Sequence, residues 1–532
     1  MSFIAENLKY LDQQFTDVCL PRLKSNKKTV ISISAAVTVS LLANYVYRLL
    51  TVPPKQFSGL PCITYVDILK SIFRGDRIYD QKKCLVLPLL DKANGEPTHV
   101  GWQIRSTNPV INKFILNDSE LFPKAENMFG RKGSLIYRFL GGKHVGSLEG
   151  SEWRRHRKII NPAFHTALPI NTFGQLSQKL FKMMETLGLK NLCVTDLCGR
   201  MTLDAIGVAG FGFDFECVSV VDNKWLKGYD NIRDNFADLF FILFQIFDDE
   251  LKWMFPHRVS AHKDLDRLLA NIDNVITEKK AEMAINGPNS SKVPAAEKDI
   301  LTLMLEAELQ GEGKLSDLEL RRNITGFFVA GMFQENCHDT TAVSLSFAIT
   351  QMGRNKEIQK KAREEVLSIL GDKPEDVLPT KEDLKEMKYL DAVIKETLRL
   401  NSPLINTLTR VASRDVEIEG LKITKGTCVD VDITSTHMNW EDGQEFKPER
   451  FLGVTDPTSN KDGINFVTFG GGSHTCPGMN FSYTEQRVFL SMLLRKFEWE
   501  LVEGSIHKDG CVAEGFGSVK PVDSRINLTK RY

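Results

Sequence analysis

The spacing of apolar residues predicts a chain built mainly from helices. In long stretches they recur every three to four residues, as on one face of an α-helix. The clearest of these stretches begin at Leu315 or cover residues 356–370 and 381–400. Strand-like runs are fewer and shorter: residues 416–423, in which Gly420 predicts a turn, and residues 428–433. This balance predicts a fold that is mainly α with a small β portion (α+β).

Residues 29–50 form the one stretch that the sequence offers as a membrane span. They reach the roughly 20 residues that a bilayer requires, although serines, an Asn and an Arg lie among them. A helix lying in the membrane interface is the alternative. Pro53 and Pro54 then predict a stiff hinge. We therefore expect an N-terminal segment (1–28), a transmembrane anchor (29–50), a Pro-rich hinge (51–61) and a main domain (62–532).

The composition excludes several classes of protein. Lys plus Arg and Asp plus Glu are equal at 68 each in 532 residues, so no basic field would attract nucleic acid. The ten cysteines are scattered without a disulfide framework, which favours a reducing compartment. No Gly-x-Gly-x-x-Gly stretch follows a predicted strand and opens a helix, which argues against a dinucleotide-binding fold.

Cys476 lies in the Gly-rich stretch 469–478 (FGGGSHTCPG), with no second Cys or His at zinc-binding spacing. Glycines let the backbone approach a ligand closely and adopt unusual dihedral angles. Residues 479–494 indicate a helix, whose positive end would favour an anionic sulfur. The stretch suits a thiolate presented to a metal that another group holds. A buried structural cysteine in a Gly-rich turn would show the same local pattern.

This stretch resembles the haem-binding loop of the haem-thiolate monooxygenases, the cytochrome P-450 family. The family pattern is Phe-x-x-Gly-x-Arg/His-x-Cys-x-Gly, and five positions match it: Phe469, Gly472, His474, Cys476 and Gly478. The resemblance extends over nearly the whole chain beyond the hinge. It implies a triangular prism of helices around a buried haem b. Cys476 would be the axial thiolate ligand of the iron, with Phe469, His474 and Gly478 against the cofactor.

Trp153 and Arg157 lie four residues apart and share one face of a predicted helix. An Arg suits bidentate binding of a carboxylate. The resemblance implies that Trp153 and Arg157, together with Arg410 and His474, contact the two haem propionates. For the other cations of 154–158 a solvated face is the simpler interpretation, and such a face would suit an acidic redox partner.

Glu396 and Arg399 lie three residues apart and would pair on one helical face. An exposed pair of this kind contributes only a few tenths of a kcal/mol and carries no functional meaning by itself. The resemblance places Arg450, from the sequence Pro-Glu-Arg-Phe, against both residues in a buried charge network behind the haem. We expect these three residues to support haem retention and not the chemical step.

The predicted oxygen-activating helix departs from the family pattern Ala-Gly-x-Asp/Glu-Thr-Thr. Six residues, 332–337, separate Ala330-Gly331 from His338-Asp339-Thr340-Thr341, and deleting them restores the pattern. Six residues turn a helix by about 600°, a net rotation of about 240°. The insert is therefore either a local bulge or an error in the inferred coding sequence. Asp339 and Thr340 are the expected proton-delivery pair.

The resemblance implies a membrane-anchored monooxygenase that inserts one atom of O2 into an apolar small molecule. An NADPH-dependent flavoprotein reductase would supply electrons, with cytochrome b5 as a further candidate partner. The expected pocket segments 126–145, 324–331, 402–408 and 514–519 are rich in apolar residues and glycine. Two alternatives remain open. One is a haem-thiolate isomerase or dehydratase that needs no O2, and the other is a haem-binding protein inactivated by the 332–337 insert.

The resemblance also implies an endoplasmic reticulum membrane location, with one N-terminal anchor and a catalytic domain (62–532) facing the cytosol. The charge bias disagrees, because Lys and Arg are denser before residues 29–50 than after them. By the positive-inside rule this bias would put the N-terminus in the cytosol. We keep the family orientation, since the haem domain needs a cytosolic electron donor.

Overall fold

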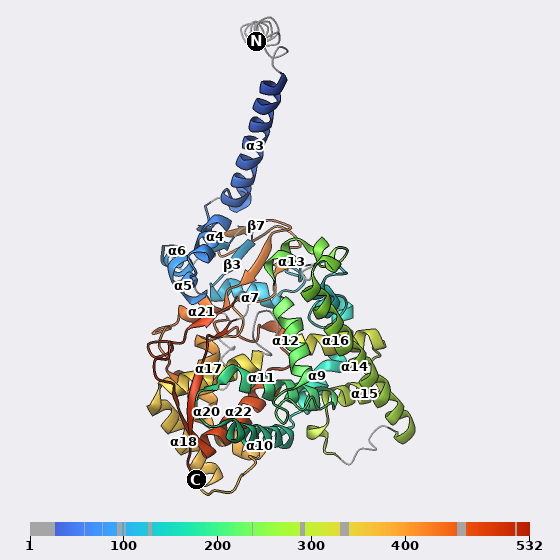
Figure 1. Ribbon diagram of the computed structural model, residues 1–532, viewed down its shortest axis with the longest axis vertical. Helices are drawn as coiled ribbons and strands as arrows, with labels where there is room; N and C mark the ends of the chain where they lie inside the picture. The colour runs from blue at the N-terminus through green and yellow to red at the C-terminus, as the bar shows by residue number, and fades with distance from the viewer. Residues whose placement is uncertain are drawn as a thin grey trace, which may run out of the picture.

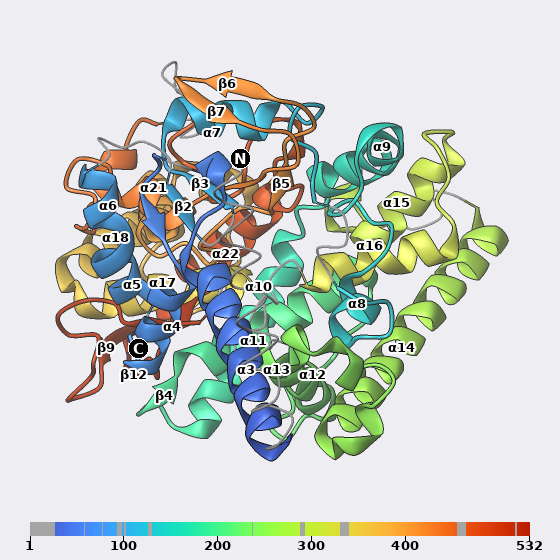
Figure 2. The same cartoon turned by 90° about the horizontal axis from the view of Figure 1, so that it is seen from above.

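The computed structural model describes residues 27–57, 59–76, 78–92, 98–100, 103–125, 130–236, 238–287, 293–329, 340–454, 464–515 and 519–532. A helical body carries small sheets along one side, and helix α3 (Lys27–Thr51) projects from it (Figure 1). Seen from above, the strands gather on one side of the body and the helices from α8 to α16 on the other (Figure 2). The predicted α+β class, mainly α with a small β portion, is confirmed.

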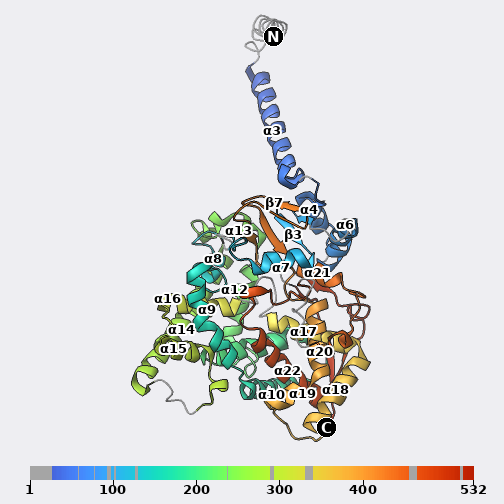
Figure 3. The same cartoon turned by 180° about the vertical axis from the view of Figure 1, so that it is seen from behind.

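The long helices of the body are α9 (Gly150–Thr166), α10 (Ile170–Leu187), α11 (Val194–Ala205), α12 (Lys224–Phe236), α14 (Pro256–Asn286), α15 (Ile300–Leu309), α16 (Asp317–Val329), α17 (Thr340–Arg354), α18 (Lys356–Leu370), α20 (Lys388–Leu400) and α22 (Met479–Lys496). The shorter helices are α4 (Tyr65–Phe73), α5 (Ile78–Gln81), α6 (Leu87–Lys92), α7 (Pro109–Asn117), α8 (Leu135–Leu140), α13 (Leu239–Leu243), α19 (Lys381–Glu386) and α21 (Ile433–Met438). Figure 3 shows α17, α20 and α22 close together in the lower part of the body, and the three helices contact one another. Nearly every residue of α17 is buried, so this helix forms the centre of the core.

The helix predicted over 381–400 is divided in the structure into α19 and α20. Met387, between them, has a non-helical conformation with φ −76° and ψ 66°. The side chain of Thr380 caps α19, and Glu365 of α18 accepts from the N–H groups of Tyr389 (2.7 Å) and Leu390 (2.9 Å) at the start of α20. Because each segment has its own N-terminal cap, two helices replace the single one expected. The helix predicted over 356–370 coincides with α18.

The largest sheet has the strand order β1-β2-β3-β8-β5 and joins the N-terminal part of the chain to its C-terminal half. Its strands are β1 (Cys62–Ile63), β2 (Thr98–Val100), β3 (Gln103–Ser106), β8 (Cys428–Val431) and β5 (Arg410–Val411). β3 and β8 pair in parallel. The strand predicted over 428–433 is shorter than expected, because the Asp432 side chain accepts from the N–H of Ser435 (2.8 Å) and so begins α21.

Two further sheets and a hairpin complete the β portion. β6 (Val416–Ile418) and β7 (Leu421–Ile423) form the hairpin expected at 416–423, with Glu419 (φ 50°) and Gly420 (φ 76°) in the turn. The other sheets contain β4 (Leu192–Cys193), β12 (Arg525–Lys530) and β9 (Phe497–Leu501), and β10 (Ala513–Glu514) with β11 (Lys520–Pro521).

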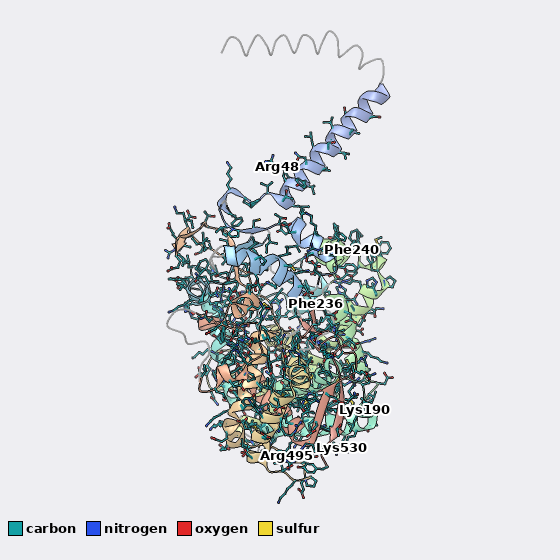
Figure 4. The ribbon with its side chains drawn as sticks, turned by 90° about the vertical axis from the view of Figure 1, so that its left-hand side faces the viewer. Arg48, Lys190, Phe236, Phe240, Arg495 and Lys530 are labelled. Carbon is teal, nitrogen blue, oxygen red and sulfur yellow. The ribbon has the colours of Figure 1, made fainter. Side chains whose placement is uncertain are left out.

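Helix α3 spans the range predicted as an anchor. Most of its described apolar side chains are exposed, for example Leu41 and Tyr45 at 64% each, and Figure 4 shows Arg48 near its base. Among the described residues, no helix is long and apolar enough to cross a membrane. Serines, Asn44 and Arg48 lie within residues 29–50 and reduce the apolar character of this stretch.

Part of the predicted hinge packs against the body of the protein. After Pro53 and Pro54 a short 3₁₀ turn, Lys55–Phe57, carries Phe57 into the core, where its side chain is 1% exposed. Phe57 packs in the apolar cluster that also contains Ile104 and Leu421. The main domain therefore includes Phe57, a few residues before the boundary expected from the sequence.

Candidate functional site

The Gly-rich stretch around Cys476 forms a compact loop that leads into α22. Gly470 (φ 75°) and Gly472 (φ 65°) have left-handed conformations, which glycine adopts without strain. The N–H of Cys476 donates to the carbonyl of Phe469 (2.9 Å), and this bond closes the loop. A Cβ at Gly472 would lie 2.4 Å from Oδ1 of Asn117, so a larger residue would not fit there. The loop is therefore held in one conformation against α7.

Cys476 is half-buried, forms no disulfide and lies three residues before the first residue of α22. The positive end of this helix favours a thiolate over a thiol. The aromatic ring of Phe469 packs against that of Tyr483 of α22, with centroids 5.2 Å apart. The loop thus presents one sulfur at the end of a buried helix.

The structure brings Trp153 and Arg157 of α9 to this loop. The indole of Trp153 stacks on the imidazole of His474, with centroids 4.1 Å apart. The guanidinium of Arg157 donates to the carbonyls of Ser473 (3.2 Å) and Thr475 (2.6 Å). Burial lowers the pKa of Arg157, and negative charge on the Cys476 sulfur opposes that fall. The four-residue spacing therefore places both α9 side chains beside the cysteine loop.

Two further cations, Lys124 and Arg410, lie close enough to His474 that burial and their charges together lower its pKa. They face each other across a β-bridge, and Arg410 donates to the carbonyl of Phe122 (2.8 Å). Glu149, at the start of α9, receives the N–H of Lys124 (3.0 Å) and lies 3.2 Å from Nε2 of His474. Lys124 and Glu149 were not predicted from the sequence, because neither has a spacing or motif that relates it to Cys476.

Charge in this cluster is not balanced. Burial lowers the pKa of Lys124 to about 8 and also lowers those of Arg410 and His474. Burial opposes ionisation of Glu149, yet its contacts with His474 and Lys124 prevail and lower its pKa. Among the described residues of this cluster, the carboxylate of Glu149 is therefore the one acidic group beside the cationic side chains of Lys124, Arg157 and Arg410.

The arrangement fits a haem. Nδ1 of His474 and Nε of Arg157 are buried and have no hydrogen-bond partner among the described residues. Buried polar groups normally form hydrogen bonds, so an anionic group with acceptor oxygens would supply the missing partners of these two nitrogens. Two propionates would supply negative charge to the cationic cluster, and an iron would take the nearby thiolate.

Thr340 is the first residue of α17 and is half-buried. The hydroxyl of its neighbour Thr341 lies 2.8 Å from that of Ser482 on α22, four residues after Gly478. The start of α17 therefore packs against the first turn of the helix that follows Cys476. Asp339 and the 332–337 insert lie outside the described residues.

Glu396, Arg399 and Arg450 meet in one network. The Glu396 carboxylate pairs with Arg399 (2.7 Å) and with Arg450 (3.1 Å), and it accepts the N–H of Lys447 (2.8 Å). Glu396 and Arg399 are completely enclosed, at 0% and 1% exposure. Arg399 also donates to three carbonyls, those of His437, Gly443 and Glu445. The pair is thus not an exposed helix-surface pair.

Known proteins resemble this chain over most of its length. The family model described as "Cytochrome P450" matches residues 107–518. Cytochrome P450 monooxygenase 128 of Postia placenta is 28% identical over 452 residues, 76% of this chain and 79% of that protein. Cytochrome P450 3A12 of Canis lupus familiaris is 29% identical over 375 residues, 66% of this chain and 69% of that protein. Cytochrome P450 4V2 of Mus musculus is 28% identical over 389 residues, 68% of this chain and 70% of that protein.

A solved structure agrees with these relatives at the level of the fold. The crystal structure of the cytochrome P450DA heme domain superposes with a TM-score of 0.68 and 21% sequence identity. The match covers 83% of this chain and 91% of that one. The arrangement of helices and small sheets described above is therefore that of a heme domain of this kind.

Proposed function

We propose that this chain inserts one atom of O2 into an apolar small molecule. The chain belongs to the cytochrome P450 family and is a monooxygenase of the oxidoreductase class. A separate NADPH-dependent flavoprotein reductase delivers the electrons, and cytochrome b5 is a further candidate donor. One observation carries the proposal: the Cys476 loop lies at the start of α22 beside cationic side chains, and buried nitrogens of His474 and Arg157 there have no hydrogen-bond partner among the described residues.

Each side chain of the site has a definite task in this proposal. Cys476 ligates the iron, and the haem, when bound, supplies the chemistry of oxygen activation. Trp153, Arg157, Arg410 and His474 hold the propionates, and Lys124 adds a charge that the sequence did not reveal. Phe469 and Gly478 shape the loop around the sulfur. Glu396, Arg399 and Arg450 form a charge network that supports haem retention and not the chemical step.

Thr340 and Asp339 are the proposed proton-delivery pair. The packing of Thr341 against Ser482 supports this role for Thr340, since it brings the start of α17 to the helix that follows Cys476. A hydroxyl and a carboxyl at this place would hold a proton for the oxygen chemistry that the haem would supply.

The residues that pack against α17 support the proposal of an apolar substrate. Val343 and Phe347 of α17 pack in one cluster with Ile405 and Val519, which come from two of the segments expected to line the pocket. All four are buried and carry no polar group. A pocket bordered by residues of this kind would bind a substrate mainly through shape and apolar contact.

Membrane attachment through residues 29–50, with the catalytic domain facing the cytosol at the endoplasmic reticulum, belongs to the same proposal. Helix α3 supports it, because the helix leaves the body and exposes Leu41, Leu42 and Tyr45 to the surroundings. Exposed apolar side chains gathered on one element favour contact with a lipid surface.

The proposal is tested on the full chain purified with haem. Carbon monoxide difference spectra should show the thiolate form, and incubation with NADPH, a flavoprotein reductase and ¹⁸O2 should place one labelled oxygen atom in an apolar substrate. Cys476→Ala should abolish both results, whereas Cys193→Ala, at another half-buried cysteine, should preserve them. A thiolate spectrum in the Cys476→Ala variant would contradict the proposal, as would turnover that needs neither O2 nor reductase.

A further inference from the structure

Both ring nitrogens of His437 bind backbone atoms of two separate segments. His437 belongs to α21 and is completely buried. Its Nδ1 lies 2.9 Å from the carbonyl oxygen of Arg399 in α20, and its Nε2 lies 3.0 Å from the amide nitrogen of Val467. The ring also stacks on that of Phe466, with centroids 5.2 Å apart and planes 16° apart.

These partners determine the tautomer of His437. A carbonyl oxygen can only accept, so Nδ1 carries the proton and donates it to Arg399. An amide N–H can only donate, so Nε2 is unprotonated and accepts from Val467. Burial lowers the pKa of His437 to about 3, and the ring therefore stays neutral at physiological pH. A protonated imidazole would lose the bond to Val467.

The link from α20 to α21 runs in both directions. The Arg399 guanidinium donates to the carbonyl of His437 (2.9 Å), while the His437 ring donates to the carbonyl of Arg399. Because the carboxylate of Glu396 also holds this guanidinium, the orientation of the imidazole is tied to the buried charge network. His437 thus has little freedom to move.

From Val467 the chain leads directly to the cysteine. Val467 lies nine residues before Cys476 and accepts the N–H of Gly470 (2.9 Å) through its carbonyl. The hydroxyl of Thr468 donates to the carbonyl of Leu398 (3.2 Å), again in α20. The carbonyl of Phe469 receives the N–H of Cys476. A displacement of the Val467 backbone would therefore be passed through Gly470 and Phe469 to the backbone of Cys476.

We infer that His437 is a positioning residue for the Cys476 thiolate. It acts through the Val467 amide and makes no hydrogen bond to the sulfur. The neutral imidazole serves as a bridge with one donor and one acceptor, which joins the charge network of α20 to the loop that presents the sulfur. This inference rests on the proposed function only in that it takes Cys476 as the iron ligand.

Three substitutions at His437 separate its two bonds. His437→Gln places an acceptor near the position of Nε2, His437→Asn places a donor near the position of Nδ1, and His437→Phe keeps a flat ring without either. Thr436→Val is the matched control, because this equally buried hydroxyl donates to the carbonyl of Asp432 (2.6 Å), accepts from Asn112 of α7 (3.5 Å) and makes no hydrogen bond to α20 or to 464–470 among the described residues. All four are made in the full, haem-loaded chain.

Two readouts are compared at equal haem content. One is the fraction of the reduced carbonyl complex in the thiolate form, and the other is the hydrogen-exchange rate of the amides of 464–468. In His437→Phe we expect the ratio of thiolate to non-thiolate complex to fall about tenfold and exchange at Val467 to quicken about tenfold, which corresponds to the net value of one buried hydrogen bond. In both readouts His437→Asn should resemble His437→Phe, whereas His437→Gln and Thr436→Val should give values close to those of the wild type.

Other results would overturn the inference. A His437→Phe chain with wild-type thiolate fraction and exchange would do so, as would a Gln variant no better than the Asn variant. If the Phe variant does not fold, the comparison of Gln with Asn still decides. Failure of the proposed function would appear differently, as a thiolate spectrum that survives Cys476→Ala, and the exchange rates of 464–468 would then still test the bond from Val467 to His437.

Discussion

The Lys82 ammonium pairs with the Asp432 carboxylate in a completely enclosed position, at 3% and 0% exposure. Lys82 precedes the residues that the family model matches, whereas Asp432 caps the helix that carries His437. Burial favours the neutral amine and lowers the pKa of Lys82, and the Asp432 charge opposes that fall. The pair therefore ties the N-terminal part of the domain to the elements behind the cysteine loop.

Lys82→Met should destabilise the protein, because it leaves a buried carboxylate without its partner. Removal of one member of such a pair costs about 3–5 kcal/mol. The temperature of haem release on heating should fall, and the double variant Lys82→Met/Asp432→Asn should recover part of the loss. Lys70→Met, at an exposed lysine of α4, is the control and should leave that temperature unchanged. An equal loss in the single and double variants would contradict the pairing.

Arg157→Ala should weaken haem binding much more than Arg154→Ala, although both residues lie on α9. Arg157 holds the carbonyls of Ser473 and Thr475, whereas Arg154 is exposed. The loss of charge-assisted bonds of this kind costs about 1.5–3 kcal/mol, or roughly 10- to 100-fold in affinity. Haem transfer to apomyoglobin gives the dissociation rates. Similar rates for the two variants would exclude a specific role for Arg157.

The pKa of Lys124 predicts that haem affinity falls as the pH rises above 8. Burial lowers this pKa to about 8, so the haem-free chain loses the proton above that pH. A propionate beside the ammonium would keep it protonated, and haem binding must then take up a proton. Below pH 8 the lysine is charged in both states and contributes no dependence. Between pH 8 and the higher pKa of the complex, the affinity should fall by up to about tenfold per pH unit.

Haem titrations from pH 7 to 10 would test this. Lys124→Arg keeps its charge throughout that range, so its affinity should lack the fall attributed to the lysine. Lys124→Met should bind haem more weakly at pH 7 and also lack the dependence. If wild type and Lys124→Arg gave parallel curves, Lys124 would not pair with a propionate.

Truncation before Gln56 should give a haem-binding domain that is less strongly bound to membranes. The cut removes α3 and retains Phe57, whose ring packs in the core. Some membrane binding should persist, because the body keeps exposed Phe240 and Trp253, and Phe240 lies on the side from which α3 projects (Figure 4). Sedimentation with vesicles and the haem content are the measurements.

A second truncation, before Gly59, would be the comparison. It also removes Phe57 and should lower the unfolding temperature, because loss of a buried Phe costs about 3–5 kcal/mol. A first truncation that cannot bind haem would show that residues 1–55 belong to the core. Equal stability of the two truncations would show that Phe57 is not part of the domain.

Deletion of 332–337 should maintain or raise monooxygenase activity. The deletion restores the contiguous family pattern that ends in Asp339 and Thr340, so both residues should keep their place relative to α17. Asp339→Asn in the deleted chain should then slow turnover, with the carbon monoxide spectrum unchanged. Loss of haem or of activity on deletion, from an active full chain, would show that the insert is an integral part of the site.

The sequence determined the helical class, the β6–β7 hairpin and the spacing of Trp153 and Arg157, because each depends on residues close together in the chain. Helical periodicity, a Gly at a turn and a four-residue interval are local signals. The same is true of the Cys476 loop, whose glycines and following helix are contiguous. Local signals predicted the ends of helices less well. The break between α19 and α20 at Met387, for example, depends on a hydrogen bond from Tyr389 to Glu365 in the preceding helix.

The tertiary structure alone decided which distant groups share a site. Lys124 and Glu149 meet His474 across more than 300 residues of sequence, and nothing local to either residue indicates that contact. The same is true of His437, whose bonds to Arg399 and Val467 exist only because α20, α21 and the loop pack together. Burial is a property of that packing, and burial is what turns an ordinary pair of charges or an ordinary histidine into a group that must be bonded.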